Sequence, residues 1–242
     1  MFSKLNRQSP NEQLALPVLQ RHDASFENFL GNANKKCVAL LKQGLEQHNE
    51  TLIYIAGPSG SGKTHLLYAA ISYFEACHEG LACYFSMDEF VENDDVEAMF
   101  EGFDSFSLVV LDNIDSWLVS KDREQSLFNL FNHFKMTGQQ LLLSSKYVPE
   151  HLTVALPDLS SRLKSGLLLN LVSLIDQEKE ALLRDLAIQK GLRLEEEVSS
   201  YIIKRSGRNL SELVGVLDTL DQASLVENRK LTVPFVKKIL QW

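Results

Sequence analysis

Several features are scarce in this sequence, and each shortage excludes a class of protein. No apolar run approaches the ~20 residues that a membrane-spanning helix requires. The N-terminus lacks the charged and then apolar pattern of a signal peptide, because the run Leu14–Leu19 is short and contains Pro17. The three cysteines, Cys37, Cys77 and Cys83, are odd in number and have no metal-type spacing, which predicts thiols in a reducing compartment. We therefore expect a cytoplasmic protein with no membrane contact.

Positive charge is also in short supply. The chain has 24 Lys and Arg against 32 Asp and Glu, which gives a formal net charge of −8. DNA-binding domains normally display a basic face, because neutralisation of phosphates supplies most of their affinity. The balance argues against direct sequence-specific DNA binding, although a local basic patch would be compatible with it. Hydrophobic residues, at 45%, suffice for a buried core and exclude a disordered chain.

Strand and helix patterns alternate over the first two thirds of the chain. A helix with Ser25 as its N-cap is expected before the first strand, and further helical patterns follow the strands, among them Asp88–Phe100 and Arg123–Met136. Near-continuous apolar runs are typical of strands buried on both faces. The alternation predicts an α/β fold with a five-stranded parallel sheet. The predicted strands are Thr51–Ala56, Leu81–Ser86, Ser107–Leu111, Gln140–Ser145 and Gly166–Val172.

The pattern becomes entirely helical from Asp176 onward. Asp176 is a candidate N-cap for a helix that Gly191 would end, and Thr232 is a candidate N-cap for the last helix. Two more helical stretches lie between them, at 195–206 and 209–226. We therefore expect an N-terminal tail at 1–20, an α/β domain at 21–175 and a small all-helical domain at 176–242.

A glycine-rich loop connects the first predicted strand to an apolar helix. It matches the phosphate-binding pattern G-x-x-x-x-G-K-[ST] at every fixed position. Glycines let backbone N–H groups turn towards phosphate oxygens, Lys63 reaches the β- and γ-phosphates, and the Thr64 hydroxyl can ligate Mg²⁺. A loop that is merely flexible is the alternative, but the flanking strand and helix favour binding of ATP or ADP with Mg²⁺. The loop consists of Gly57, Pro58, Ser59, Gly60, Ser61, Gly62, Lys63 and Thr64.

A second motif is the apolar run 108–111, which ends in the carboxylate Asp112. An Asp at the end of a neighbouring strand can hold Mg²⁺ through its water shell. The next residue is Asn113, whose amide cannot act as the base that polarises the attacking water, so we expect weak intrinsic hydrolysis. Asp115 lies two residues on and either faces the site or is a solvated loop residue.

Five stretches of the sequence resemble DnaA-type replication initiators of the AAA+ superfamily, in the same order. The resemblance covers about residues 21–242 and implies an AAA+ P-loop domain followed by a helical lid domain. It also implies that His65, directly after the loop, lies among the nucleotide-binding residues. The five stretches are Ser25–Phe29, Gly62–Leu67, Ser86–Phe90, Leu111–Asp115 and Leu156–Arg162.

Two parts of an initiator are not found here, its N-terminal partner domain and its C-terminal helix-turn-helix domain. What is present is similar to the Hda-type paralogues of DnaA, which inactivate the initiator. The tail is similar too, since residues 13–18 resemble the Q-L-x-L-P-L peptide by which these paralogues dock on the DNA polymerase sliding clamp. Gln13 can offer hydrogen bonds, Leu14, Leu16 and Val18 can fill apolar pockets, and Pro17 lowers the ordering entropy. An arm packed on the protein's own surface is the alternative.

The resemblance further implies an arginine finger at Arg162, just before the fifth predicted strand. Such a guanidinium stabilises charge on the phosphoryl group in a neighbouring subunit and accelerates GTPases by about 10³–10⁵. A surface Arg near Asp158 is the alternative. The sensor positions depart from the family pattern. Ser211 stands where the lid carries a sensor Arg, and Arg208 would substitute only after a shift of the lid. After the fourth predicted strand, Ser145 or its neighbour Ser144 is a candidate polar sensor.

These residues leave three hypotheses. The first is a clamp-docked regulator that activates ATP hydrolysis by a DnaA-type initiator and itself hydrolyses ATP weakly. The second is a stand-alone AAA+ ATPase or helicase-loading factor, and Asn113 and Ser211 count against it. The third is a DNA-binding initiator fragment, which the net charge of −8 disfavours. The first hypothesis is preferred, and a homodimer or an AAA+ type oligomer is compatible with it.

Overall fold

The computed structural model describes residues 24–29, 31–47, 50–90, 100, 102–206, 210–227 and 230–242. The predicted clamp peptide, Gln13–Val18, and the candidate sensor Arg208 lie outside these ranges. Side-chain statements also exclude Ser211, whose backbone lies in a helix.

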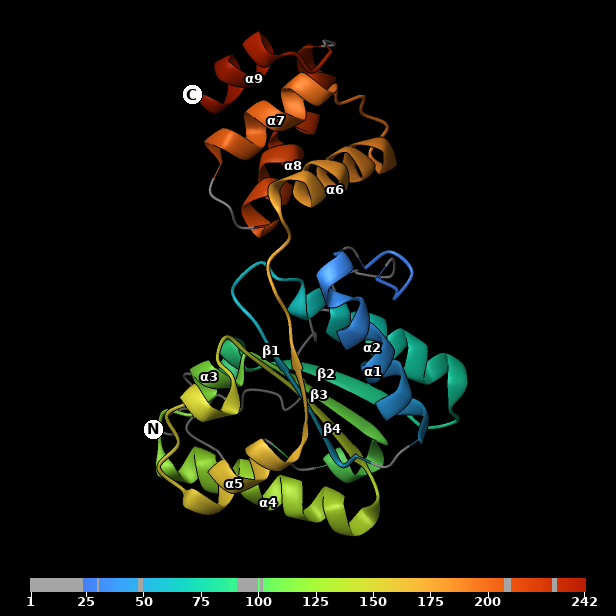
Figure 1. Cartoon of the computed structure of the whole chain (residues 1–242), viewed down its shortest axis with the longest axis vertical. Coiled ribbons are helices and arrows are strands. Elements are labelled where there is room, and N and C mark those ends of the chain that lie inside the picture. The colour runs from blue at the N-terminus through green and yellow to red at the C-terminus, as the bar shows by residue number, and fades with distance from the viewer. Residues whose placement is uncertain are drawn as a thin grey trace, which may run out of the picture.

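A five-stranded parallel sheet forms the centre of the first part of the chain (Figure 1). The strand order is β2-β3-β4-β1-β5, and every neighbouring pair is parallel. The sheet confirms the fold class that the alternating pattern predicted. The strands are β1 (Leu52–Ala56), β2 (Ala82–Ser86), β3 (Leu108–Asp112), β4 (Gln140–Ser145) and β5 (Leu167–Asn170).

Helices cover both faces of the sheet (Figure 1). Side chains alternate between the faces along each strand, so each face has its own apolar core. Ile55, Val110 and Leu142 pack with the helices α1 and α2, whereas Tyr54 and Leu143 pack with α4 and α5. The helices of this part are α1 (Lys35–Gln47), α2 (Lys63–Cys77), the short α3 (Ile114–Trp117), α4 (Lys121–Thr137) and α5 (Pro157–Ser165).

The segment before the first strand differs from the prediction. Ser25 does not cap a helix. Its N–H donates to Asn28 Oδ1 at 3.0 Å and its hydroxyl accepts from Asn28 N at 3.3 Å, which closes a single turn. Gly31 then adopts a φ of 111°, a conformation that interrupts a helix, and only the 3₁₀ turn η1 (Asn32–Asn34) leads into α1.

Three further 3₁₀ turns lie in the connections. They are η2 (Met87–Phe90), η4 (Phe103–Ser105) and η5 (Pro149–His151). The turn η2 occupies the start of the predicted helix Asp88–Phe100, whose residues 91–99 lie outside the described part of the chain. The described residues that directly follow β2 therefore form a 3₁₀ turn, at the place where the sequence predicted the start of a helix.

The last part of the chain is helical (Figure 1), and it has its own apolar core. It contains α6 (Asp176–Gln189), α7 (Glu196–Arg205), α8 (Leu210–Glu227) and α9 (Val233–Leu240). Thr232 is the N-cap of α9, since its hydroxyl accepts from Phe235 N at 3.4 Å, and Gly191 follows α6 with a φ of 73°. Asp176 is the first residue of α6 and not its N-cap, because Ile175 takes that place and donates its N–H to the Glu178 carboxylate at 3.2 Å. The helical lid that the sequence predicted is thus present.

Two hydrogen-bonded links tie the start of α1 to the passage from β5 into the lid. The Asn34 side-chain amide donates to Val172 O and accepts from Val172 N, both at 3.0 Å. Asn32 N donates to Glu178 Oε1 of α6 at 3.0 Å. Each part contains one tryptophan: Trp117 is fully buried beside the sheet, and Trp242 packs in the lid, 6.1 Å from the Tyr201 ring. Among the described residues, no helix combines the length and the apolar character needed to cross a membrane.

Candidate nucleotide site

The glycine-rich loop turns sharply between β1 and α2. Gly57 N donates to Ser145 O at 3.2 Å, and Ser61 N donates to Pro58 O at 3.2 Å. Gly62 has a φ of 92° and is the N-cap of α2. A Cβ atom at Gly57 would lie 2.9 Å from the backbone oxygen of Leu171, so the close approach of these two backbone segments requires glycine there. Ser61 Oγ is buried without a hydrogen-bond partner among the residues that the structure describes.

Lys63 points back into this loop. Its ammonium group donates to Gly57 O at 2.8 Å and to Pro58 O at 3.2 Å, and the residue is only 6% exposed. Burial lowers the pKa of Lys63, and the nearby Asp112 carboxylate opposes that shift. A polyphosphate bound in the loop would place further negative charge beside this buried cation.

Asp112 is the centre of a hydroxyl cluster at the end of β3. It is 1% exposed and accepts from Thr64 Oγ1 at 2.7 Å, from Tyr84 OH at 2.9 Å and from Ser144 Oγ. Burial and the Asp112 charge raise the pKa of Tyr84, which keeps its phenol protonated. The sequence motifs pair Thr64 with Asp112 as metal-binding residues, and the structure places these two side chains in direct contact.

Sequence reasoning missed Tyr84 as part of this cluster, and it named Ser144 only together with Ser145 as a possible polar sensor. The register of the sheet pairs Ser86 with Asp112, so Tyr84, two residues earlier, lies on the same face one residue pair away. Tyr84 is stacked on Tyr68 of α2, with ring centroids 4.5 Å apart. Strand alternation distinguishes Ser144 from Ser145, because Leu142 and Ser144 lie on the face that packs with α2.

Of the two serines at the end of β4, the structure brings Ser144 and not Ser145 to Asp112. The Ser145 side chain belongs to the opposite row of β4, and its hydroxyl accepts from Tyr147 N at 3.0 Å. It is fully buried beside Tyr54, whose phenol donates to Tyr147 O at 3.0 Å. Ser144, by contrast, contacts Asp112 and accepts from Asn113 N at 3.0 Å.

Asn113 is held in place from two sides. It has a left-handed φ of 61°, which Asn tolerates better than most residues. Its side-chain Nδ2 donates to Asp88 Oδ2 at 2.8 Å. The water-polarising position is therefore occupied by an amide that is itself hydrogen-bonded to a carboxylate.

Asp115 lies two residues further along the chain. Its carboxylate accepts from Lys146 N at 3.0 Å and so joins the ends of β3 and β4.

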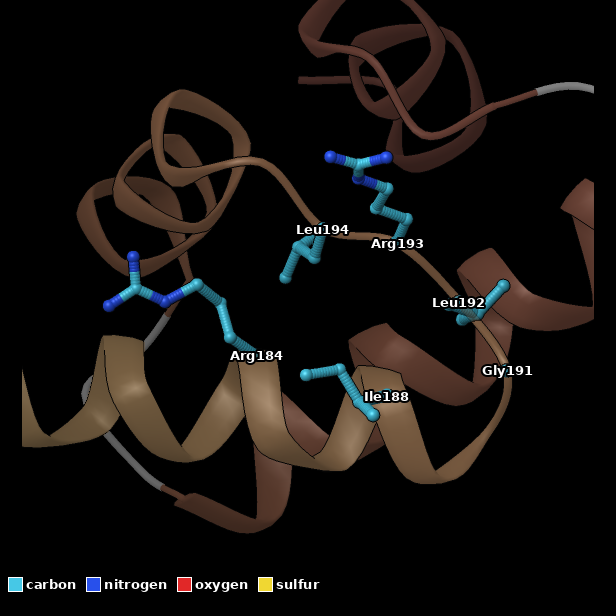
Figure 2. A pocket seen from close by; sticks show the side chains of 6 residues that line it. All are labelled: Arg184, Ile188, Gly191, Leu192, Arg193 and Leu194. Carbon is cyan, nitrogen blue, oxygen red and sulfur yellow. The ribbon is translucent and has the colours of Figure 1, made fainter.

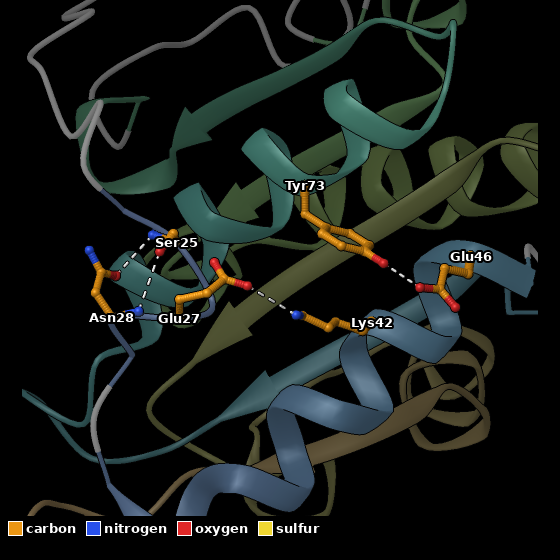
Figure 3. A network of polar contacts seen from close by, with 6 residues as sticks. All are labelled: Ser25, Glu27, Asn28, Lys42, Glu46 and Tyr73. Carbon is orange, nitrogen blue, oxygen red and sulfur yellow. Dashed lines mark hydrogen bonds and ion pairs between the residues drawn. The ribbon is translucent and has the colours of Figure 1, made fainter.

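The turn before α1 lies against the loop. His65 Nε2 is 2.9 Å from Asn28 Oδ1, and the Phe29 ring lies so close to Gly62 that a Cβ atom there would be 2.9 Å from Phe29 Cε2. His65 thus contacts the turn before α1. Figure 3 shows how this turn is anchored: Glu27 accepts from Lys42 of α1 at 3.3 Å.

The same anchor extends across α1 and α2. The Lys42 ammonium lies 5.0 Å from the Phe26 ring centroid and 5.3 Å from that of Tyr73, which donates its phenol to Glu46 (Figure 3). Cation–π contacts of this kind add to apolar packing. The turn that covers Gly62 is therefore fixed to both helices of this face of the sheet.

Arg162 lies apart from these residues, on α5 and on the other face of the sheet. Its guanidinium carbon is 5.6 Å from the ring centroid of Phe131, and the residue is half-buried. Leu159 and Leu163 of the same helix are buried in the core beneath α4. Arg162 therefore does not belong to the group of side chains around Lys63 and Asp112.

A pocket in the lid is separate from all of these residues (Figure 2). It lies between α6 and the connection to α7, and none of the predicted site residues lines it. Its lining side chains include Ile188, Leu192 and Leu194, with Arg184 and Arg193 at its edge. Arg193 pairs with Glu195 at 3.3 Å.

Comparison with known proteins identifies the family. Residues 20–170 match the family model of the bacterial DnaA ATPase domain, and residues 176–240 match that of the Hda lid domain. This chain belongs to the DnaA/Hda family of AAA+ proteins. It is an Hda-type DnaA paralogue, and its family makes it a DnaA-related replication regulator.

Relatives and solved structures agree with this family. An uncharacterized protein of Haemophilus influenzae is 39% identical over 233 residues, which are 95% of this chain and 99% of that protein. Domain III of the DnaA replication initiation protein of Thermotoga maritima has a TM-score of 0.80 at 22% identity, over 91% of this chain and 96% of that one. AMPPCP-bound DnaA from Aquifex aeolicus has a TM-score of 0.70 at 25% identity, over 85% of this chain and 67% of that one.

Proposed function

We propose that this Hda-type protein is a nucleotide-binding regulator that stimulates ATP hydrolysis by a DnaA-type initiator while docked on the sliding clamp. The observation that carries the proposal is Asn113. The Thr64–Asp112 contact and the buried Lys63 leave the binding site complete, whereas the position that would polarise water holds an amide bound to Asp88. A site of this composition retains nucleotide and turns it over slowly, as suits a regulator rather than a motor.

Nucleotide binding is assigned to the glycine-rich loop, Gly57–Thr64. Three observations support it: the glycine-dependent turn at Gly57, the buried Ser61 hydroxyl without a partner, and the buried Lys63 cation. The loop leads into the N-terminus of α2, where the positive end of the helix dipole would favour a bound phosphate. An AMPPCP-bound DnaA shares this fold, which further supports ATP or ADP as the ligand.

Mg²⁺ would be held by Thr64 and Asp112, whose oxygens suit a hard cation. The ion would offset charge on the phosphates. Ser144 and Tyr84 donate to the same carboxylate and so keep Asp112 oriented towards Thr64. Of the remaining candidates, His65 would act on nucleotide indirectly, through the turn at Asn28, and Arg208 would act only from the lid.

Arg162 is assigned to the partner's nucleotide. Its guanidinium lies beside Phe131 on the far face of the sheet, and the residue is half-buried, so part of Arg162 is accessible to another subunit. A cation placed against the transferring phosphoryl group would stabilise the charge that develops there. The initiator's own site supplies the nucleotide and the water.

Docking on the clamp is assigned to the tail, residues 13–18. The support is its sequence, in which leucines and valine alternate with smaller or polar residues before and after a proline. An extended peptide of this kind binds through apolar pockets. Clamp docking would bring Arg162 close to initiators at sites of DNA synthesis.

The test is ATP hydrolysis by a DnaA-type initiator, measured with and without this protein and with DNA-loaded clamp. We expect stimulation that requires both additions and that Arg162→Ala abolishes, while the variant's own nucleotide affinity stays unchanged. Absence of stimulation by the wild-type protein, or full stimulation by Arg162→Ala, would refute the proposal.

A stand-alone AAA+ ATPase or helicase-loading factor is the second candidate. The intact set of Thr64, Asp112 and Ser144 favours it, because these groups also serve enzymes that hydrolyse ATP by themselves. Intrinsic hydrolysis by the purified protein separates the two functions. Rapid multiple turnover without an initiator would support this second candidate.

A further inference from the structure

A buried carboxylate on α4 holds the beginning of α5. Glu124 is 4% exposed, its Oε1 accepts from Ala155 N at 2.9 Å, and its Oε2 accepts from Leu156 N at 2.6 Å. Leu156 is the N-cap residue of α5 and has no side-chain oxygen with which to cap the helix. Glu124 thus places a negative charge next to the N-terminus of α5, where the helix dipole favours it.

The two hydrogen bonds fix the direction in which α5 starts. Both carboxylate oxygens are used, and a buried carboxylate tolerates little displacement from donors that stabilise its charge. Pro157 follows directly and has a restricted φ, so the rotation of the first turn is set by the backbone at Leu156. A shift at this point would be carried along the nine residues of α5.

The helix α4 also contacts α5 at Arg162. Phe131 lies seven residues after Glu124 on α4 (131 − 124), which is about two turns of an α-helix and therefore the same side. Its ring is 6% exposed and lies 5.6 Å from the guanidinium carbon of Arg162. One stripe of α4 therefore contacts both the start of α5 and its arginine.

We propose that Glu124 and Phe131 are positioning residues for Arg162. Glu124 sets the placement of α5, and Phe131 holds the guanidinium through a cation–π contact, so that the charged group is oriented before a partner binds. The inference rests on the proposed function, in which Arg162 acts on the nucleotide of the initiator. Neither residue needs to touch the initiator.

The test compares variants in the initiator ATPase assay while the concentration of this protein is varied. Glu124→Gln keeps the size of the side chain and one acceptor, and Phe131→Leu removes the aromatic face. Displacement of a catalytic group by about 1 Å can cost on the order of 100-fold in rate. We expect both variants to lower the maximal stimulated rate by about tenfold or more, with the half-saturating concentration of this protein unchanged.

Matched controls and folding measurements accompany these variants. Asp122→Asn makes the carboxylate-to-amide change of Glu124→Gln at an exposed position of α4. Phe128→Leu makes the aromatic-to-aliphatic change of Phe131→Leu at a half-buried position of the same helix. Both controls should stimulate like the wild-type protein. Nucleotide affinity and the melting temperature monitor the fold. Should Glu124→Gln fail to fold, Phe131→Leu leaves the Glu124 hydrogen bonds intact and tests the same proposal.

The outcomes separate the inference from the function on which it rests. If Arg162→Ala loses stimulation while folded Glu124→Gln and Phe131→Leu keep the full maximal rate, the positioning role is wrong and the proposed function stands. If the two variants raise the half-saturating concentration at an unchanged maximal rate, they act in docking and the inference is again wrong. Full stimulation by Arg162→Ala overturns both.

Discussion

At the scale of single residues, Lys63 combines burial with positive charge in a loop whose carbonyl oxygens are its hydrogen-bond partners. Burial lowers the pKa of Lys63 and also reduces the screening of its charge by water, so its attraction to a bound phosphate should be strong. We expect Lys63→Ala to weaken nucleotide binding by at least about 10–100-fold, the effect of losing one charge-assisted hydrogen bond. Isothermal titration with ATP and ADP measures this effect. Lys36→Ala, at an exposed position of α1, is the control, and retained affinity in Lys63→Ala would remove the loop from the site.

The hydrogen bond between Asn113 and Asp88 can be tested through the stability of the fold. In Asn113→Asp, two carboxylates would lie where Nδ2 and Asp88 Oδ2 are now 2.8 Å apart. Like charges at this distance raise carboxyl pKa values in the folded state, so the destabilisation appears as pH rises through them. We expect a loss of about 1 kcal/mol or more at pH 8 and a smaller loss at pH 4.

Denaturation of Asn113→Asp at both pH values checks this expectation. The double variant Asp88→Asn with Asn113→Asp restores one amide and one carboxylate, and its stability should return towards that of the wild-type protein. An equal loss of stability at both pH values in the single variant would show that charge repulsion is not the cause.

Single residues also mark the limit of sequence reasoning about the site. The glycine-rich loop and Asp112 were predictable because both are defined along the chain. Tyr84 was not, because its contact with Asp112 depends on the pairing of β2 with β3. Ser144 and Ser145 face opposite sides of the strand, and only the packing of β4 against α2 shows that Ser144 is the one on the side of Asp112.

At the scale of elements, Tyr54 links β1 to the connection after β4. Its phenol donates to Tyr147 O at 3.0 Å, and burial raises the pKa of Tyr54 to about 12. The phenol is neutral in the fold, so its contribution is complete below pH 10 and is lost as pH rises towards 12. We expect Tyr54→Phe to cost about 1 kcal/mol at pH 7.

The same reasoning predicts how this difference changes with pH. The stability of the wild-type protein should fall more steeply than that of Tyr54→Phe above pH 10, because only the wild-type gains ionisation of this phenol on unfolding. Urea denaturation between pH 7 and pH 11 measures it. Parallel stability curves for the two proteins would contradict the assignment.

Elements differed in how well the sequence predicted them. The strands were recognisable because their apolar runs are nearly continuous, as burial on both faces requires. The helix before β1 is present as α1, but its predicted start at Ser25 was wrong, because Ser25 and Asn28 bond to each other locally and Gly31 has a positive φ. The helix α5 gives little signal of its own, since it has nine residues and is placed by contacts with α4.

At the scale of the whole molecule, the order of patterns predicted the fold, whereas no local pattern predicts how the lid is attached. The two hydrogen bonds between the Asn34 side chain and the Val172 backbone, and the hydrogen bond from Asn32 to Glu178, join residues more than 130 positions apart. Their partners are identifiable only once β5 has been placed beside β1. The clamp peptide and Arg208 stay predictions.

The tail can be tested in the complete protein. We expect replacement of Leu16 and Pro17 by Ala to reduce retention on immobilised clamp at least tenfold, because the apolar contact of Leu16, worth about 1–2 kcal/mol, and the restriction of the free peptide by Pro17 would both be lost. The melting temperature should not change. Gln8→Ala, also in the tail, is the control, and unaltered retention of the Leu16 and Pro17 variant would exclude this peptide as the docking segment.

The distribution of the two tryptophans provides a spectroscopic reporter for each half of the protein. Trp117 is enclosed beside the sheet, so its fluorescence should be blue-shifted, whereas Trp242 is partly accessible in the lid and should emit at longer wavelength. Phe substitutions, Trp117→Phe or Trp242→Phe, would isolate either signal. Independent melting of sheet and lid, or their coupling by a nucleotide, could then be read optically without any added label.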